Sequence, residues 1–303
     1  MAVASAFIGV VLIWGTTPLA VQWSLEGSSF AFAVMARMVL GVVLCLTLLH
    51  LSGIRLPRHR NALLTYTVGG LGIFGAMTST YWSAQFIPSG WISILFGLSP
   101  LCTGFLAMVW LGERFGGERL LGTLVSLAGL SMIFLQGTSD PSGNTLMGIF
   151  GIVFAVSLYA TSTVLVKKLG EGIPAFATTT GSLMVAVPGF ILVWAVTDGQ
   201  LPQEISPRAF WSILYLGVIA SAIGFTLFYY VLEQLEAGET MLITLINPVI
   251  GIYLGTALNN EALSMRFIAG TGMILFGLAI YQWGAPLRTR LAGSKAGKLP
   301  LTY

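Results

Sequence analysis

The sequence predicts an all-α integral membrane protein in which ten transmembrane helices form two inverted five-helix repeats. Three observations lead to this fold class. Hydrophobic residues make up 56% of the 303 positions and charged residues only 8%, whereas an ordinary soluble domain carries about 25% charged residues. The chain contains ten apolar runs with roughly the 20 residues that cross a bilayer. Finally, its second half repeats features of its first half.

The ten predicted spans follow one another with short connections, such as the Gly- and Ser-containing turn at 26–29. The first five spans define a repeat at 1–138 and the last five a repeat at 145–285, with a loop at 139–144 between them and a basic tail at 286–303. In chain order the predicted spans are 3–23, 30–51, 62–85, 90–111, 118–136, 145–166, 174–197, 209–232, 238–258 and 264–283.

The internal repeat is visible at a constant spacing. The stretch from Pro100 to Glu113 returns as Pro248 to Glu261, and the difference in residue number (248 − 100) is here called the repeat offset. This many matches at one ungapped offset indicate an internal duplication. The same offset pairs Tyr81 with Tyr229, Gly90 with Gly238, Leu106 with Leu254, Gly122 with Gly270, and Gly129 with Gly277.

The basic residues predict the orientation, because cytoplasmic loops carry an excess of Lys and Arg. With the N-terminus inside, the outer loops hold only Arg208 and Arg266. Both termini are then cytoplasmic, and five spans per repeat invert the second repeat, a pattern typical of alternating-access carriers with a midplane site. The inner segments hold Arg55, Arg58, Arg60, Arg114, Arg119, Lys167, Lys168, Arg288, Arg290, Lys295 and Lys298.

Several motifs carry a resemblance to a known family: Trp14-Gly15 in the first span, Arg37 in the second, and a Pro…Gly-Glu pattern ending at Glu113. With its two five-helix halves, nearly the whole chain resembles the drug/metabolite transporter superfamily, within it the EamA-type carriers, and more narrowly bacterial exporters of aromatic and other neutral amino acids. The resemblance implies outward transport of a small neutral or zwitterionic solute across the inner membrane. The second half departs from the pattern, since Ser182 stands at the counterpart of Arg37 and Asn259-Asn260-Glu261 replaces Leu-Gly-Glu.

The resemblance places the pathway on the first, third and fourth spans of each repeat, where aromatic and polar residues share helix faces. A polar face in lipid is costly, so it should turn toward a neighbouring helix or a water-filled path. For any single Ser or Thr, an interhelical hydrogen bond is the alternative. The candidate substrate-binding residues are Trp14, Thr17, Thr78, Tyr81, Gln85, Phe96, Tyr159, Tyr229, Thr244 and Asn247.

Arg37 is the one charge well inside a span, where it should face protein or water. It could act as the counter-charge of a substrate carboxylate, or it could bind backbone carbonyls at broken helix ends, which is the interpretation we favour. Pro100 and Pro248 are candidate hinges, because a proline removes a backbone hydrogen bond. The carbonyls released near Phe96 and Thr244 would suit an ammonium group. A static kink is the alternative.

The sequence contains no motif for catalysis within its spans: no Ser–His dyad, zinc-ligand cluster or phosphate-binding loop. We therefore expect no enzyme activity, no catalytic or metal-binding residues and no cofactor. Cys45 and Cys102 are interpreted as small apolar residues. Expected partners are a small solute and the lipid bilayer, without nucleic acid.

The protein is expected to be a monomer or a weak homodimer. The glycine pairs spaced by seven residues in the fifth and tenth spans predict close helix contacts and a candidate dimer interface. They are Gly122 and Gly129, and Gly270 and Gly277.

Two questions remain: whether transport is coupled to protons, and which alternative functions fit the sequence. Glu113 and Glu261 precede helices whose positive N-terminal ends attract carboxylates, so their default role is structural and proton coupling is the minority interpretation. No Asp, Glu, Lys or His lies near the centre of a span, which predicts transport without proton exchange. The alternatives are a broad exporter of small apolar metabolites or drugs and, outside transport, a helical receptor or assembly factor.

Overall fold

The computed structural model describes residues 3–53, 55–112, 116–137, 143–240, 243–259 and 264–296, and these residues form helices and short connections without a strand. Glu113, Glu261 and most of the predicted loop at 139–144 lie outside the described residues. The elements are α1 (Val3–Ser24), α2 (Phe30–Leu51), α3 (Arg60–Ser83), α4 (Ser89–Phe96), α5 (Ser99–Leu111), α6 (Gly117–Gly137), α7 (Asn144–Leu169), α8 (Ala175–Thr197), α9 (Pro207–Tyr215), η1 (Leu216–Ile223), α10 (Gly224–Gln234), α11 (Ala237–Thr240), α12 (Ile243–Asn259) and α13 (Met265–Ala296).

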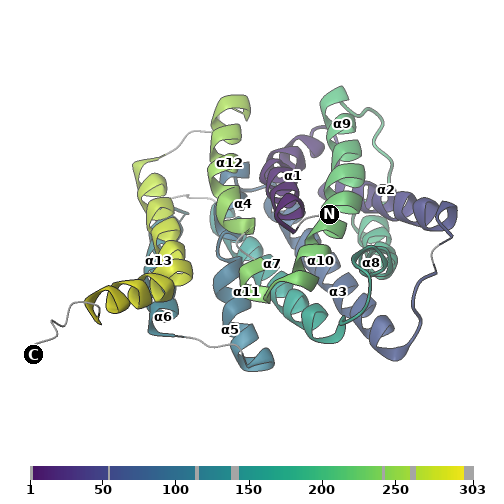
Figure 1. Cartoon of the computed structure of the whole chain (residues 1–303). Helices are drawn as coiled ribbons and strands as arrows, with labels where there is room; N and C mark the ends of the chain where they lie inside the picture. The colour runs from purple at the N-terminus through teal and green to yellow at the C-terminus, as the bar shows by residue number, and fades with distance from the viewer. Residues whose placement is uncertain are drawn as a thin grey trace, which may run out of the picture.

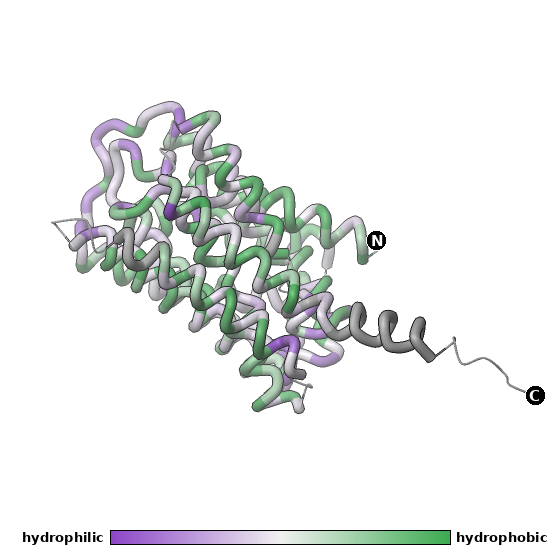
Figure 2. The backbone as a smooth tube through the Cα atoms, turned by 90° about the vertical axis from the view of Figure 1, so that its left-hand side faces the viewer, coloured by the Kyte–Doolittle hydropathy of each residue, from purple (hydrophilic) through white to green (hydrophobic). Residues whose placement is uncertain are grey.

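Among the described residues, seven helical segments are long and apolar enough to cross a membrane. Figure 2 shows that the hydrophilic residues gather mainly in the turns between the helices. The other predicted runs, 118–136, 238–258 and 264–283, are also largely helical, as α6, α11 with α12, and α13. The seven segments are Val3–Ser24, Phe30–Leu51, Arg60–Ser83, Ser89–Leu111, Asn144–Leu169, Ala175–Thr197 and Pro207–Gln234.

Three predicted helices differ in detail from the observed ones. The run at 90–111 is divided at Gly97 and Leu98 into α4 and α5. The run at 209–232 contains the π-helix η1, and α13 continues past 283 to Ala296. Apolar periodicity could not show these differences, because it reports which segments are helical and not where the hydrogen-bond register changes.

Elements of the second half begin and end at the same spacing as those of the first half. The first residues of α4 and α11 are separated by the repeat offset (237 − 89), as are those of α6 and α13 (265 − 117). The last residues of α5 and α12 show the same separation (259 − 111). The order of helical elements therefore recurs along the chain.

The four paired glycines of the fifth and tenth predicted spans form a contact within the chain, here called the glycine seam (Gly122, Gly129, Gly270 and Gly277). A Cβ atom on Gly277 would lie 2.5 Å from the carbonyl oxygen of Gly122, and one on Gly129 would lie 2.5 Å from that of Gly270. These pairings run in opposite directions, so α6 and α13 are antiparallel (Figure 1). The seam thus joins the two halves of one chain, as the predicted close helix contacts require, and a dimer interface on these helices stays a prediction.

Small residues also let the helices around α1 approach closely, as is common in membrane bundles. Gly15 of α1 faces the side chain of Ile250 on α12. On α3, Gly72 faces Ser162 of α7, and Gly75 faces Leu158. These approaches bring the helices of both halves around a common centre, where α1 lies beside α10 and α12 (Figure 1).

Candidate binding cavity

A cavity lies among α1, α2, α3, α4, α7, α10 and α12. It encloses about 650 Å³ of space that no atom occupies, its open side included. Both halves of the chain contribute to it. The lining residues are Trp14, Thr17, Pro18, Val21, Arg37, Met77, Thr80, Ile92, Ser93, Phe96, Tyr159, Phe225, Thr244 and Asn247.

α1 contributes one continuous face to the cavity. Trp14, Thr17, Pro18 and Val21 follow at i, i+3, i+4 and i+7, which places them on the same side of a helix. Pro18 lies inside α1, and because it has no N–H, the carbonyl of Trp14 loses its intrahelical donor. The cavity therefore extends from the middle of α1 toward the end of the helix at Ser24.

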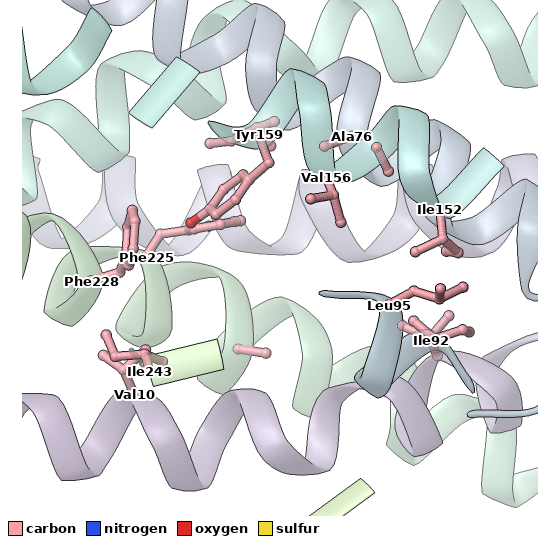
Figure 3. Packing of buried hydrophobic residues seen from close by; sticks show 14 of the residues in the cluster. Val10, Ala76, Ile92, Leu95, Ile152, Val156, Tyr159, Phe225, Phe228 and Ile243 are labelled. Atoms are coloured by element: carbon pink, nitrogen blue, oxygen red, sulfur yellow. The ribbon is translucent and has the colours of Figure 1, made fainter. Parts of the chain in front are cut away.

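Four rings form an aromatic cluster at the N-terminal end of this face of α1: Trp14, Tyr159, Phe225 and Phe228. The centroid of the Trp14 ring lies 6.0 Å from that of Tyr159, 5.8 Å from Phe225 and 4.9 Å from Phe228. Figure 3 shows Tyr159, Phe225 and Phe228 above Val10 and Ile243, and Val10 and Ile243 have no exposed surface. The cluster thus separates the cavity from tightly packed side chains nearer the start of α1.

Six of the ten residues predicted to bind substrate line the cavity: Trp14, Thr17, Phe96, Tyr159, Thr244 and Asn247. The other four, Thr78, Tyr81, Gln85 and Tyr229, do not. On α3 the lining residues are Met77 and Thr80, one position before the predicted Thr78 and Tyr81. Neighbouring residues on a helix point about 100° apart, so an error of one residue turns a predicted face away from the cavity.

The displaced side chains have other surroundings. Tyr81 is fully buried, and its hydroxyl accepts a hydrogen bond from Arg37 Nη1 at 3.5 Å. Gln85 is exposed and donates to the carbonyl of Trp82 at 3.1 Å. Tyr229 lines a second space near the ends of α7 and α10. A polar, aromatic stripe marks a protein-facing side of a helix, but it does not distinguish a cavity from a packed neighbour.

The sequence prediction missed several lining residues, and the repeat could have found some of them. The repeat offset separates Met77 from Phe225 (225 − 77) and Phe96 from Thr244 (244 − 96), and all four residues line the cavity. A site residue in one half therefore points to its partner in the other. Val21 and Ile92 are apolar, so no polar stripe marked them. Pro18 was visible as a proline within a span.

Arg37 is the only charged side chain among the buried described residues, with 1% of its surface exposed. Its Nε donates to Ser221 Oγ at 2.9 Å, and its Nη1 reaches the Tyr81 hydroxyl at 3.5 Å. These partners correct the favoured prediction that Arg37 binds backbone carbonyls at helix ends. The ion pair found among the described residues joins Arg208 to Glu26. No described carboxylate therefore neutralises Arg37.

Most hydroxyl groups of the cavity donate their proton to their own helix. Thr17 donates to the carbonyl of Ile13 at 2.9 Å, and Thr80 donates to that of Ala76 at 2.7 Å. Ser93 donates to the carbonyl of Ser89 at 3.3 Å. A hydroxyl bound in this way retains only acceptor lone pairs.

Asn247 adds another acceptor to the cavity. Its Oδ1 atom is buried without a hydrogen-bond partner among the described residues. A buried polar atom without a partner loses its hydration without compensation, so this oxygen is suited to a donor brought by a ligand. The acceptors of the cavity thus include the three hydroxyls and Asn247 Oδ1. Its neutral donors include the Nδ2 group of Asn247 and the hydroxyl of Tyr159, which is buried without a partner among the described residues. Its charged donor is the guanidinium of Arg37.

The two candidate hinges occupy different places. Pro100 lies in the first turn of α5, where its missing N–H costs no hydrogen bond. This corrects the prediction of a mid-helix proline there, because the break at Gly97 and Leu98 precedes it. Pro248 lies inside α12, and its Cγ would be 3.2 Å from a Cβ on Gly97. The carbonyl of Phe96 accepts from Ser99 Oγ at 2.6 Å.

A helical bundle with seven apolar spans among its described residues and a cavity at its centre is a multi-pass membrane protein. The sequence matches the EamA-like transporter family over residues 1–135 and again over 146–282. The chain belongs to this family and is a membrane transporter rather than an enzyme.

Relatives that align with most of the chain are also named as transporters or exporters. The chain is 26% identical over 247 residues to the probable terminal-alkyne amino-acid exporter of Streptantibioticus cattleyicolor, covering 80% of this chain and 81% of that one. It is 22% identical over 275 residues to the uncharacterized transporter YoaV of Bacillus subtilis (strain 168), covering 89% and 93%. It is 24% identical over 282 residues to the uncharacterized inner membrane transporter YedA of Escherichia coli (strain K12), covering 92% and 90%.

A solved structure shares the fold. It is titled "Crystal structure of protein", and it superposes with a TM-score of 0.71 at 16% sequence identity, covering 94% of this chain and 98% of that chain. At this identity the likeness concerns the arrangement of helices alone.

Proposed function

We propose that the protein is a secondary transporter that exports aromatic and other neutral amino acids across the inner membrane. The observation that carries this proposal is a cavity that joins an aromatic cluster to a single buried cation and several hydrogen-bond acceptors. Aromatic rings recognise apolar side chains through area and ring contacts. The relative named as a probable amino-acid exporter supports both the cargo class and the direction.

The transport cycle we propose is alternating access between two inverted five-helix repeats. The recurrence of helix ends at the repeat offset and the antiparallel contact of α6 with α13 support this arrangement. With both termini in the cytoplasm, α1 runs outward, and the cavity between Trp14 and Val21 lies in the outer half of the membrane. In this cycle we assign the structure to the outward-facing state, with the aromatic cluster across the inner path.

Transport without proton exchange is the proposed energetics. Proton coupling by competition requires a titratable group at the binding site. Arg37 is the one buried charged side chain of the described residues, and no carboxylate, lysine or histidine among them lines the cavity. Glu233 and Glu239 are exposed. The cargo would accordingly move down its own gradient.

Counterflow into proteoliposomes tests the proposal. Vesicles preloaded with unlabelled amino acid should accumulate labelled L-phenylalanine, L-tryptophan and L-leucine at equal rates with and without an imposed pH gradient. Protein-free vesicles are the control. Uphill accumulation driven by the pH gradient would contradict the energetics alone. Flux of lipophilic cations in place of amino acids would favour a drug exporter, and no flux of any solute would favour a receptor or assembly factor.

A further inference from the structure

Charge is distributed unevenly in the cavity, because Arg37 is the one charged residue among the described residues that line it, together with several neutral hydrogen-bonding groups. We propose that Arg37 binds the carboxylate of the cargo, while Asn247 Oδ1 and the acceptor hydroxyls of Thr17, Thr80 and Ser93 face its ammonium group. This assignment rests on the proposed function and names the groups that recognise the amino-acid backbone. The aromatic cluster would then contact the cargo side chain.

The hydrogen bonds of Arg37 leave its outer nitrogens available. Nε is engaged by Ser221 at 2.9 Å, but the contact of Nη1 with Tyr81 is 3.5 Å, at the limit for a hydrogen bond. The remaining N–H groups have no acceptor among the described residues. A carboxylate binds two such N–H groups in parallel, and it could replace the long contact with Tyr81.

Ser221 is held in place by the π-helical segment η1. Its hydroxyl donates to the carbonyl of Leu216, five residues earlier, at 2.9 Å. In an α-helix the corresponding bond would reach the fourth residue, so the wider turn of η1 determines where Ser221 Oγ lies. Single π turns occur often at functional sites. Here the turn positions the one serine that holds Arg37 from the opposite half of the chain.

Two glycines bring η1 close enough to α2 for this bond. A Cβ on Gly217 would lie 3.0 Å from the carbonyl oxygen of Arg37, and a Cβ on Gly41 would lie 3.0 Å from Cβ of Ser221. Larger residues at these positions would separate α2 from η1. The close approach of α2 and η1 therefore fixes the direction of the Arg37 guanidinium group.

The second half has no equivalent group. α8 begins 145 residues after α2 (175 − 30), and at this spacing the counterpart of Arg37 is Ser182. Ser182 is fully buried and does not line the cavity. A single cation in a site without a described carboxylate repels a cationic cargo and attracts an anionic group. A zwitterion matches both kinds of group at once, since its carboxylate would bind the cation and its ammonium would bind the acceptors.

Binding to the purified full-length protein tests the assignment with three probes that share one side chain: L-phenylalanine, L-phenylalaninamide, which lacks the carboxylate, and 3-phenylpropanoate, which lacks the ammonium. The wild type should bind L-phenylalanine at least about tenfold more tightly than the amide, since a bidentate charged pair is strong. Arg37→Gln should abolish this preference by weakening the binding of both carboxylates. Arg37→Lys should keep only part of it, because lysine lacks the planar fork.

Matched variants keep the test decisive. Arg266→Gln, an exposed arginine at the start of α13, should bind as the wild type does. Ser221→Ala should weaken L-phenylalanine binding severalfold and leave the amide unchanged, and Ser157→Ala, on an exposed face of α7, should change neither. If Arg37→Gln does not fold, the comparison of Ser221→Ala with Ser157→Ala tests the role of Arg37 in carboxylate binding.

The outcomes separate this assignment from the proposed function. An unchanged preference in folded Arg37→Gln, together with amino-acid flux, would overturn the role of Arg37 alone. Arg37-dependent binding of 3-phenylpropanoate without amino-acid flux would keep the carboxylate site and overturn the proposed function. Absence of binding of all three probes to the wild type would overturn both.

Discussion

At the scale of single residues, Trp14 connects the cavity with the packed interior. Its ring contacts those of Tyr159, Phe225 and Phe228. Its Nε1 atom lies where a Cβ on Gly224 would be only 2.9 Å away, so α10 can approach α1 here only because residue 224 has no side chain. The ring therefore contributes both to the cavity surface and to the close packing of α1 against α10.

Trp14→Ala and Tyr159→Ala are expected to raise the KM for bulky amino acids by about tenfold, because each removes a ring worth about 1 kcal/mol or more of contact with the cargo. Small cargo such as alanine should be affected less. The measurement is concentration-dependent counterflow in proteoliposomes that hold equal amounts of folded protein.

Tyr253→Ala serves as the matched control. Tyr253 lies on α12 with 69% of its surface exposed, outside the cavity, so its loss should leave KM unchanged. Wild-type KM values in both Trp14→Ala and Tyr159→Ala would show that these rings only pack against one another.

At the scale of elements, the glycine seam connects α13 with α6. Ser126 adds a hydrogen bond across it, since its hydroxyl donates to the carbonyl of Ile274 at 3.1 Å. A second connection links α13 to the cavity-lining helix α4, because the rings of Trp91 and Phe267 stack with centroids 5.0 Å apart. The position of α4 thus depends in part on how α13 packs.

Gly277→Ile is expected to lower the melting temperature of the detergent-solubilised protein by several degrees. The new Cβ would lie 2.5 Å from the carbonyl oxygen of Gly122 and 2.6 Å from the backbone nitrogen of Ser126. Overpacking of this kind costs about 1–3 kcal/mol. The change is measured by thermal unfolding followed through circular dichroism.

Gly272→Ile is the control on the same helix, because a Cβ at this position would meet no atom within 4 Å apart from the neighbouring backbone of its own helix. Both substitutions change helix propensity equally, so the difference between them reports the seam. Equal melting temperatures for the two variants would mean that α6 and α13 do not meet at Gly277.

At the scale of the whole molecule, the arrangement of the two halves decides how the cavity can be reached. Ser52 follows α2, and Gln203 follows α8, the corresponding helix of the second half; both residues are exposed. If the halves are inverted, these loops lie on opposite sides of the membrane. Cys45 and Cys102 are free cysteines and are replaced by alanine in the background for labelling.

In this background, Gln203→Cys in intact cells should react with a membrane-impermeant maleimide, whereas Ser52→Cys should react only after permeabilisation. The physical reason is the excess of basic residues in the segments assigned to the cytoplasm. Permeabilised cells, in which both cysteines should react, provide the control. Reaction of both positions from the same side of intact cells would falsify the inverted arrangement.

Composition and periodicity were sufficient for the class of the protein and for much of the helical pattern. With 8% charged residues the chain cannot cover a water-facing surface, and a segment that buries its backbone in lipid must be helical. The predicted spans at 3–23, 30–51 and 174–197 therefore agree with α1, α2 and α8 within one residue at each end. These properties depend on local sequence, so the sequence determined them by itself.

The identity of the cavity lining depended on the tertiary structure. The division of the fourth span at Gly97 and the rotation of α3 decide which side chains line the cavity. The π turn of η1 places the Ser221 hydroxyl that accepts a hydrogen bond from Arg37. The sequence by itself indicated Trp14, Tyr159 and Asn247, because polar and aromatic residues within spans are costly in lipid. It could not show that Arg37 donates hydrogen bonds to Tyr81 and to Ser221, which lies 184 residues later in the chain. Those contacts exist only once the helices pack together.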